Sequence, residues 1–191
     1  MLYAKLKIYG MYKIRQKITT VVNLIKFKMF HVECGEKFSG KGLIYIKACS
    51  GKIKIGQNVR INSARWANPI GNKIKTSFQI IDNGQIIIGN NVGISNTSIT
   101  SAIGVSIGNN VLIGSGTEIT DTDFHELPIG TSAAVKTAEV VIEDNVFIGS
   151  NCTILKGTHI GHNSVIGANS VVTKAIPAGE TWAGIPAKRI K

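Results

Sequence analysis

Acidic residues and cysteines are scarce in this chain of 191 residues. The chain has 11 Asp and Glu against 22 Lys and Arg, and the only acids in its first 75 residues are Glu33 and Glu36. The three cysteines, Cys34, Cys49 and Cys152, lie far apart and lack the spacing of a metal site. Neither a disulfide framework nor a bound metal is therefore expected, and this cysteine usage fits a reducing cytoplasm.

The shortage of acids is confined to one end of the chain. Residues 1–75 hold 16 Lys and Arg with two acids, a net charge of +14, whereas residues 76–191 hold six bases and nine acids, a net charge of −3. A basic cluster on a nearly neutral body favours attraction to an anionic surface or glycan. No nucleic-acid-binding motif accompanies the cluster, so nucleic acid is not expected as a partner.

Long hydrophobic runs are also missing from the basic end. In residues 1–30 the longest stretch without a charge is Ile18 to Ile25, much shorter than the ~20 apolar residues that span a bilayer. The same charges interrupt the apolar centre that a secretory signal needs. We expect one or two amphipathic helices here, which either pack on the protein itself or a sister subunit, or lie on an anionic membrane.

From Gly42 onward, short apolar runs alternate with Gly and Asn turns, which predicts strands joined by tight turns and an all-β fold. A six-residue rhythm of aliphatic residues runs through Ile107, Ile113 and Ile119, and then through Ile142, Ile148, Ile154, Ile160, Ile166 and Val172. Three such hexads form one coil of a triangular prism, with the aliphatic side chain inside and Gly or Asn at the corners. Stacked coils then pair as parallel sheets.

This rhythm divides the chain into a basic, helical N-terminal segment, residues 1–41, and a β-helix, residues 42–191. Position five of each hexad holds a small residue or Val, and Cys152 stands at such a position. Cys152 is therefore interpreted as a small core residue and not as a nucleophile or ligand.

The rhythm stops at Thr120–Pro128, which reads TDTDFHELP, and resumes near residue 142. An insertion this long predicts a protruding loop. His125 can accept a proton from a hydroxyl group while a carboxylate holds its other ring nitrogen. Asp123 lies two residues away, on the same side of an extended segment, and is the first candidate for that carboxylate; Asp121 and Glu126 remain alternatives.

Three motifs in order resemble the hexapeptide-repeat acyltransferases: ISNTSIT at 94–100, TDTDFHELP at 120–128 and GANSVVTKAIPAGETWAGIPAKRIK at 167–191. The resemblance is to the branch with maltose, galactoside and capsular-glycan O-acetyltransferases. It implies a left-handed parallel β-helix and transfer of an acetyl group from acetyl-CoA to a sugar or polysaccharide hydroxyl. It also implies direct attack in a ternary complex, with His125 as general base and a backbone N–H stabilising the oxyanion.

The resemblance also assigns binding residues. It places Asn96 at an acceptor-contacting position, although Asn96 is equally well explained as a turn residue of the repeat. The positions that match cofactor contacts are Phe147, Ser150, Ala168, Thr173 and Lys174, with Lys188 preferred over Arg189 and Lys191 as a phosphate contact. Family members form homotrimers in which the active site lies between subunits, so the loop at 120–141 is expected to reach a neighbouring chain.

Two alternatives remain open. A metal enzyme of the β-helical carbonic-anhydrase type could use His125, His159 and His162, but the odd spacing of the last two predicts that they point in different directions. A non-catalytic binding or assembly protein could use the basic N-terminal segment alone. The acceptor is expected to be a glycan intermediate, and residues 1–30 suggest peripheral association with the inner face of a membrane.

Overall fold

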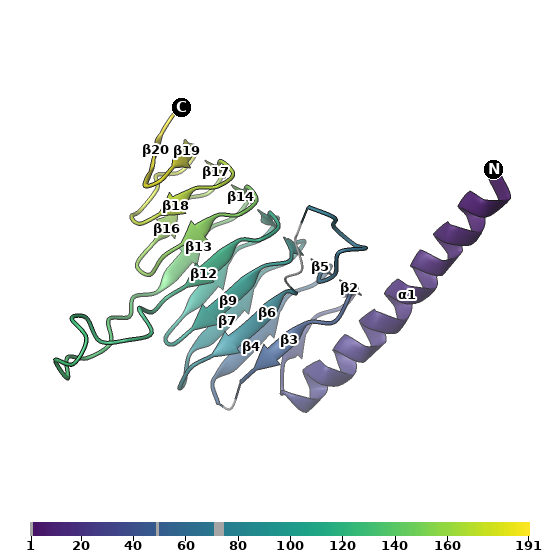
Figure 1. Ribbon diagram of the computed structural model, residues 1–191, viewed down its shortest axis with the longest axis horizontal. Coiled ribbons are helices and arrows are strands. Elements are labelled where there is room, and N and C mark those ends of the chain that lie inside the picture. Colours follow the sequence, from purple (N-terminus) through teal and green to yellow (C-terminus); the bar gives the residue numbers. More distant parts are fainter. Residues whose placement is uncertain (1, 49, 71–74) are drawn as a thin grey trace.

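One long helix precedes a stack of short strands (Figure 1). The computed structural model describes residues 2–48, 50–70 and 75–191, with side chains from Tyr9 onward, so Cys49 lies outside the described residues. The helix, α1, spans Leu2–Met29. It ends in a Schellman motif, because the N–H of Val32 donates to Phe27 O, the N–H of His31 donates to Lys28 O, and His31 has a left-handed φ of 52°.

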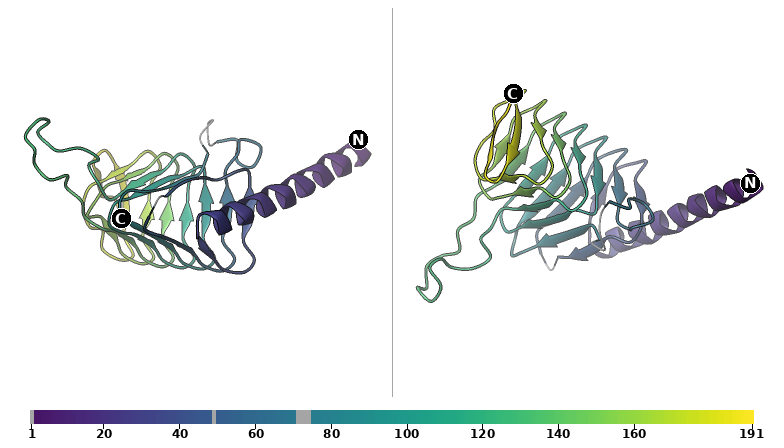
Figure 2. Two further views of the ribbon diagram at one scale, coloured as in Figure 1. Left: turned by 90° about the horizontal axis from the view of Figure 1, so that it is seen from below. Right: turned by 45° about the horizontal axis from the view of Figure 1, so that its top comes forward.

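The strands form three sheets, one on each side of a prism (Figure 2). Sheet A contains β1 (Glu33–Cys34), β4 (Lys52–Ile55), β7 (Gln85–Ile88), β10 (Val105–Ile107), β13 (Val140–Ile142) and β16 (His159–Ile160). Sheet B contains β2 (Ser39–Lys41), β5 (Arg60–Asn62), β8 (Gly93–Ser95), β11 (Leu112–Ile113), β14 (Phe147–Ile148), β17 (Val165–Ile166), β19 (Thr181–Gly184) and β20 (Ala187–Arg189). Sheet C contains β3 (Tyr45–Lys47), β6 (Ser77–Ile80), β9 (Ser98–Ser101), β12 (Glu118–Thr120), β15 (Thr153–Ile154) and β18 (Val171–Val172).

Successive coils pair in parallel, whereas the final pair of strands, β19 with β20, is antiparallel. The predicted all-β parallel β-helix of hexapeptide coils, with a helical N-terminal segment and a protruding loop, is therefore confirmed. From β3 to β19, the inward position of each strand holds an aliphatic or aromatic residue that stacks on its equivalent one coil away. Fully buried members of these columns are Ile55, Ile88, Ile107, Ile142 and Ile160 in sheet A, Ile61, Ile94, Ile148 and Ile166 in sheet B, and Phe78, Ile99, Ile119 and Ile154 in sheet C. Small residues fill the corners, and Cys152, 1% exposed, is one of them, as predicted.

The coil begins earlier than residue 42. Strands β1 and β2 already pair with β4 and β5, so residues 33–41 belong to the first coil and not to the N-terminal segment. The hexad pattern does not reveal this coil because Gly40 stands in register with Ile61, at an inward position. A Cβ at Gly40 would lie 2.5 Å from Nδ2 of Asn23, so the missing side chain makes room for α1.

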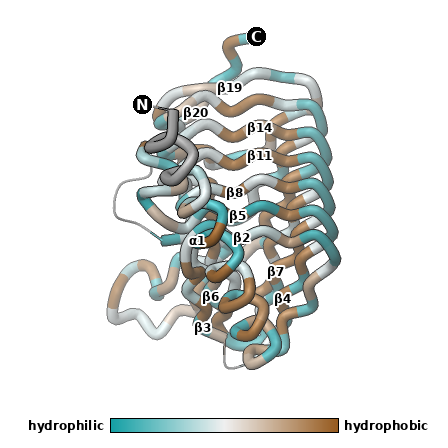
Figure 3. Tube along the Cα trace, turned by 90° about the vertical axis from the view of Figure 1, so that its right-hand side faces the viewer, coloured by the Kyte–Doolittle hydropathy of each residue, from teal (hydrophilic) through white to brown (hydrophobic). Residues whose placement is uncertain are grey.

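The corners repeat as faithfully as the core. Figure 3 shows hydrophilic turns stacked on hydrophilic turns along the prism. At the corner between sheets A and B, the side chains of Asn58, Asn91, Asn110 and Asn145 form a ladder in which each Nδ2 donates to the next Oδ1 at 2.9–3.1 Å. All four residues have φ between 54° and 60°, a left-handed conformation that Asn tolerates better than most residues.

Both ends of the coil are covered. At the first coil α1 packs on β1 and β2, with Phe27 against Phe38 at 5.0 Å between ring centroids. At the last coil the ring of Trp182 is buried and lies 5.2 Å from Nζ of Lys174. No helix in the described part of the chain is both long and apolar enough to cross a membrane.

Replacing Ile119 by Ala removes a fully buried side chain from the column of sheet C, between Ile99 and Ile154. The rigid stack cannot close the cavity, so the free energy of unfolding should fall by about 2–5 kcal/mol in denaturant titrations. Ile129→Ala, at a position 83% exposed, is the matched control and should change it by less than about 0.5 kcal/mol. Equal losses in the two variants would contradict the stacked core.

Candidate active site

A long loop, residues 121–139, leaves the prism at the corner between sheets C and A, after β12, and returns into β13. Figures 1 and 2 show it projecting sideways, well clear of the coils. Its two legs are held together near the prism, where Thr122 bridges Thr137 and the N–H of Asp123 donates to Lys136 O at 3.1 Å. Residues 124–135 beyond this stem form the exposed tip, apart from the half-buried Glu126. The predicted protruding loop is present.

The carboxylate of Asp121 anchors the loop. It is fully buried and accepts four hydrogen bonds, from Oγ of Ser101 at 2.8 Å and from the backbone N–H groups of Ala102, Ile103 and Gly104 at 2.7–2.9 Å. Those three N–H groups belong to the turn between β9 and β10, one coil nearer the N-terminus. Asp121 therefore fixes the point at which the chain leaves the coil, and it does not face His125.

His125 is exposed at the start of the tip, and its ring makes no hydrogen bond to any described residue. The predicted contact between the Asp123 carboxylate and the His125 ring is absent, and the two residues are joined by the His125 N–H, which donates to Asp123 O at 2.8 Å. Phe124 has a left-handed φ of 64°, so residues 123 and 125 do not share a face of an extended segment, as their spacing had suggested. Asp123 instead forms an ion pair with Nζ of Lys156 at 2.6 Å.

Glu126 is engaged as well, because its Oε1 accepts the N–H of Gly130 at 2.9 Å. Each of the three carboxylates considered from the sequence thus has its own partner within the described chain. The His125 ring is left facing outward, which suits a group that acts on something outside this chain.

Three predicted binding residues occupy equivalent positions on another corner, between sheets B and C. Asn96, Ser150 and Ala168 each follow an inward Ile of sheet B by two residues, and Ser115 fills the same position in the coil between. Exposure increases along this column, which we call the B–C column, from the buried Asn96 and Ser115 to the exposed Ala168. The prediction from sequence missed Ser115, although the same spacing from Ile113 marks it. Its hydroxyl oxygen is buried and has no hydrogen-bond partner among the described residues.

Asn96 has the geometry of a turn residue. Its φ is 45°, its N–H donates to Asn62 O at 2.8 Å, and its own carbonyl accepts the N–H of Gly116 at 3.0 Å. The turn role considered from the sequence is therefore present, and a contact with an acceptor remains a prediction.

Close packing of coils characterises the upper part of the B–C column. The N–H of Asn169 donates to Ser150 O at 2.9 Å, and a Cβ on Gly149 would lie 2.5 Å from the nitrogen of Ala168. Beside the column, Phe147 is 47% exposed on the outer face of sheet B, in register with Val165 of the next coil. The exposed side chains of Phe147 and Ala168 thus lie on the same part of the surface.

The remaining cofactor candidates lie apart from these residues. Thr173 and Lys174 follow β18, at the edge of sheet C that is farther from the B–C column. Nζ of Lys174 lies over the ring of Trp182. Lys188 on β20 is exposed at the margin of sheet B, whereas the neighbouring Arg189 pairs with Glu180 at 3.2 Å. Lys188 is thus the one of these two cations that remains available for a phosphate.

A cluster that the sequence did not predict lies on sheet A. Glu143 accepts hydrogen bonds from His159 at 2.7 Å and from both the ring, at 3.0 Å, and the backbone N–H of His162, at 2.8 Å. The bond from His159, followed by those from His162, lowers the pKa of the Glu143 carboxyl to about 2. The expectation that the two histidines point apart is wrong, because His162 lies in the turn after β16, where strand alternation does not apply. Among the described residues no group of His, Cys, Asp and Glu has the arrangement of a metal site.

Several known proteins are similar to this chain in sequence or structure. Residues 139–174 match the family model described as a hexapeptide repeat of succinyl-transferase. WbbJ of Escherichia coli K12, named as a lipopolysaccharide biosynthesis O-acetyl transferase, is 38% identical over 119 residues, which cover 56% of this chain and 61% of WbbJ. The hexapeptide-repeat acetyltransferase VCA0836 of Vibrio cholerae, solved with acetyl-CoA, is 32% identical with a TM-score of 0.54, over 60% of this chain and 63% of that one. The chain is thus similar to hexapeptide-repeat acetyltransferases over the matched regions.

This similarity confirms the resemblance seen in the three motifs, and the left-handed sense expected of the coil agrees with it. A galactoside acetyltransferase solved with coenzyme A is also similar, at 26% identity and a TM-score of 0.55 over 86% of this chain and 66% of that one. This hexapeptide-repeat protein spans about three fifths of the length of WbbJ and VCA0836. The matched repeat at 139–174 contains Phe147, Ser150 and Ala168 but not His125.

Replacing Asp121 by Ala should loosen the base of the loop, because three backbone N–H groups and Ser101 lose their acceptor. The free energy of unfolding should fall by about 1–3 kcal/mol, and trypsin should cut after Lys136 faster. Glu126→Ala, which removes a carboxylate from the same loop, should change stability by less than about 0.5 kcal/mol. If Asp121→Ala were as stable and as protease-resistant as the parent, Asp121 would not be the anchor.

Proposed function

We propose that the protein is an acetyl-CoA-dependent O-acetyltransferase that acts on a hydroxyl group of a sugar or cell-surface polysaccharide precursor. The observation that carries the proposal is His125, an exposed histidine with an unengaged ring, on a loop that a buried carboxylate holds away from the coil. Similarity to proteins that were solved with acetyl-CoA or CoA supports acetyl-CoA as the donor. The name of WbbJ favours transfer to oxygen.

In this proposal His125 is the general base. One ring nitrogen accepts the proton of the acceptor hydroxyl while its oxygen attacks the thioester carbonyl carbon. The carbon–sulfur bond then breaks, and His125 returns the proton to the departing CoA thiolate, so that an acetyl ester and free CoA result. No acetylated enzyme is required. Cys152 is unsuited to form one, because burial raises the pKa of its thiol.

The B–C column is the proposed cofactor site. Phe147, Ser150 and Ala168 line its upper part, where the pantetheine arm can lie against small side chains and an aromatic ring. Lys188 is proposed to contact a CoA phosphate, while Thr173 and Lys174 would contact the cofactor from the far end of sheet C. Asn96 is proposed to contact the acceptor, from two coils below Ser150 in the same column.

A homotrimer is proposed because, within one chain, the loop that carries His125 and the B–C column lie apart. The loop bearing His125 leaves at the corner between sheets C and A, whereas the B–C column runs along the other edge of sheet C. The projecting loop would reach the B–C column of a neighbouring subunit. Asp123, held by Lys156, would then help to position the loop and need not touch His125.

The proposed acceptor is a glycan intermediate, and the proposed location is cytoplasmic, at an anionic membrane surface. The net charge of +14 in residues 1–75 favours such a surface. No observation favours the metal enzyme considered from the sequence, because His159 and His162 both bind Glu143, away from His125. The non-catalytic binding protein is not favoured either, because the N-terminal segment alone does not explain the loop.

His125→Ala should lower kcat by about 10²–10⁴-fold, because the hydroxyl group loses its base. Release of free CoA from acetyl-CoA can be followed with a thiol reagent against a panel of sugars and nucleotide sugars. His162→Ala, which removes an exposed histidine elsewhere on the coil, should retain activity. Full activity in His125→Ala would refute the proposed role.

The shared site makes a second prediction. Chains carrying His125→Ala and chains carrying Ala168→Trp, which blocks the B–C column, should each be inactive alone. Co-assembled in equal amounts, they should recover about a quarter of the parent activity, because a quarter of randomly formed interfaces join an intact histidine to an intact column. If each chain holds a complete site, mixing will restore nothing.

A further inference from the structure

Helix α1 turns a mostly polar face toward the coil. Oγ1 of Thr19 donates to Gly40 O at 2.6 Å, and the fully buried Asn23 donates to Gly42 O at 2.8 Å and accepts the N–H of Ile44 at 3.0 Å. Phe27 is the one large apolar side chain of the described part of α1 that is fully buried. The helix is therefore held on the first coil largely by hydrogen bonds.

The opposite face of α1 is apolar and exposed. Five residues at alternating steps of three and four form one stripe along the helix, which we call the outer stripe: Met11, Ile14, Ile18, Val21 and Ile25, each 56–62% exposed. A helix on a water-facing surface normally has the reverse orientation, with its apolar face inward. An exposed apolar stripe of this length marks a surface that something covers.

Cations border the outer stripe. Lys17 and Lys28 lie along one side and Arg15 along the other, and none of them forms an ion pair with a described residue. No acid precedes Glu33 in the chain. Packing two copies of α1 stripe to stripe would set cation against cation, whereas an anionic bilayer offers the opposite charge, and lysine and arginine stems can extend from its apolar region to its headgroups.

The position of α1 also suits a flat surface. It contacts the strands of the first coil and lies across the end of the prism, with its N-terminal half projecting past the side (Figure 1). The outer stripe thus faces away from all the coils. A helix of 28 residues is about 42 Å long, and a plane can meet its whole outer face at once.

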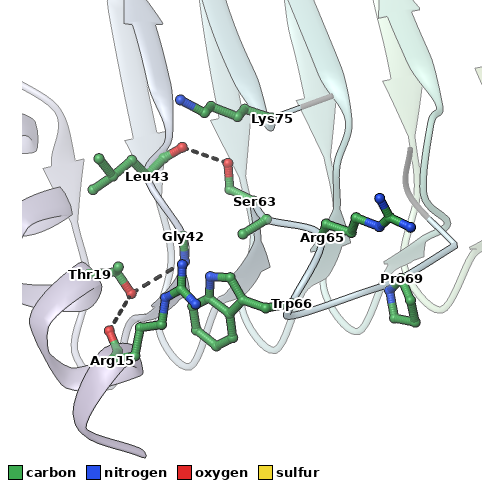
Figure 4. A pocket seen from close by; sticks show the side chains of 10 residues that line it. Arg15, Thr19, Gly42, Leu43, Ser63, Arg65, Trp66, Pro69 and Lys75 are labelled. Atoms are coloured by element: carbon green, nitrogen blue, oxygen red, sulfur yellow. Dashed lines mark hydrogen bonds between the residues drawn. The ribbon is translucent and has the colours of Figure 1, made fainter. Parts of the chain in front are cut away.

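An aromatic and cationic pocket lies at the same end of the molecule. Figure 4 shows Trp66 next to the side chain of Arg15, with Arg65 and Lys75 lining the same pocket. The guanidinium carbon lies 4.8 Å from the centre of the Trp66 ring, and the pocket has a volume of about 740 Å³. Tyr12 packs against the Trp66 ring at 5.9 Å. Tyr and Trp favour the boundary between water and lipid, so these rings support the same orientation.

We infer that the outer stripe of α1 inserts into the boundary between headgroups and acyl chains of an anionic bilayer, so that the prism stands on the membrane with its first coil downward. This inference rests on the membrane location in the proposed function and assigns it to one face. Apolar insertion holds the protein there, and the bordering cations select anionic lipid.

Flotation with lipid vesicles tests the inference. The full chain should bind vesicles of phosphatidylcholine with 30% phosphatidylglycerol and not pure phosphatidylcholine vesicles, in 0.15 M NaCl. The double variant Ile18→Gln, Ile25→Gln should lower the partition coefficient at least tenfold. The matched control is Ile87→Gln, Ile103→Gln, which alters two exposed isoleucines on the coil and should bind as the parent does.

Two further measurements on the parent and the variants complete the experiment: light scattering gives the molar mass, and release of CoA with a soluble sugar as acceptor gives the activity. Loss of vesicle binding with unchanged mass and unchanged activity would support the inference. Parent-like binding by the stripe variant would overturn it, and so would a fall in its molar mass, since the stripe would then be a contact between chains. Failure of the proposed function would instead show as full activity in His125→Ala, whatever the vesicles report.

Discussion

Backbone hydrogen bonds between successive coils hold this structure together, and they leave two ends where no further coil is present. Each end needs a cover, because unpaired strand edges and an open core would otherwise meet water. At the last coil the antiparallel strand β20 and the Trp182 ring provide it. At the first coil α1 provides it with polar side chains, helped by Gly40 in place of an inward aliphatic residue. Because the polar face of α1 covers the coil, its apolar face is directed outward.

The repeat also limits where chemistry can be added. An insertion within a strand would break the register of both neighbouring coils, whereas a corner can lengthen without disturbing them. Residues 121–139 leave the prism at such a corner. The turn before β10 has three backbone N–H groups that need acceptors, and the buried carboxylate of Asp121 accepts all three. A side chain on this loop, such as His125, can therefore move relative to the coil without weakening the core.

Periodicity predicted most of the fold because the inward position recurs every six residues and tolerates little but aliphatic side chains, from Ile107 to Val172. It failed at the first coil, where Gly40 hides the pattern, and at His162, where a turn sets the direction of the side chain. In the loop, the predicted pairing of Asp123 with His125 required an extended chain. Phe124 between them has a left-handed backbone conformation, so the chain is not extended there. Lys156, the actual partner of Asp123, lies 33 residues away, and local spacing gives no sign of it.

The orientation proposed for α1 constrains the acceptor. Along sheet B, four strand-to-strand steps separate β2, beneath which α1 lies, from β14, which leads into Ser150. At about 4.8 Å a step, the upper B–C column stands roughly 20 Å above the first coil. A sugar attached directly to a lipid headgroup would remain near the pocket of Arg15 and Trp66, below the column. Under the proposed function, an acceptor that is bound to a membrane lipid would therefore carry a glycan that reaches past Asn96, two steps above β2, toward Ser150, and the acetylated hydroxyl would lie toward its distal end.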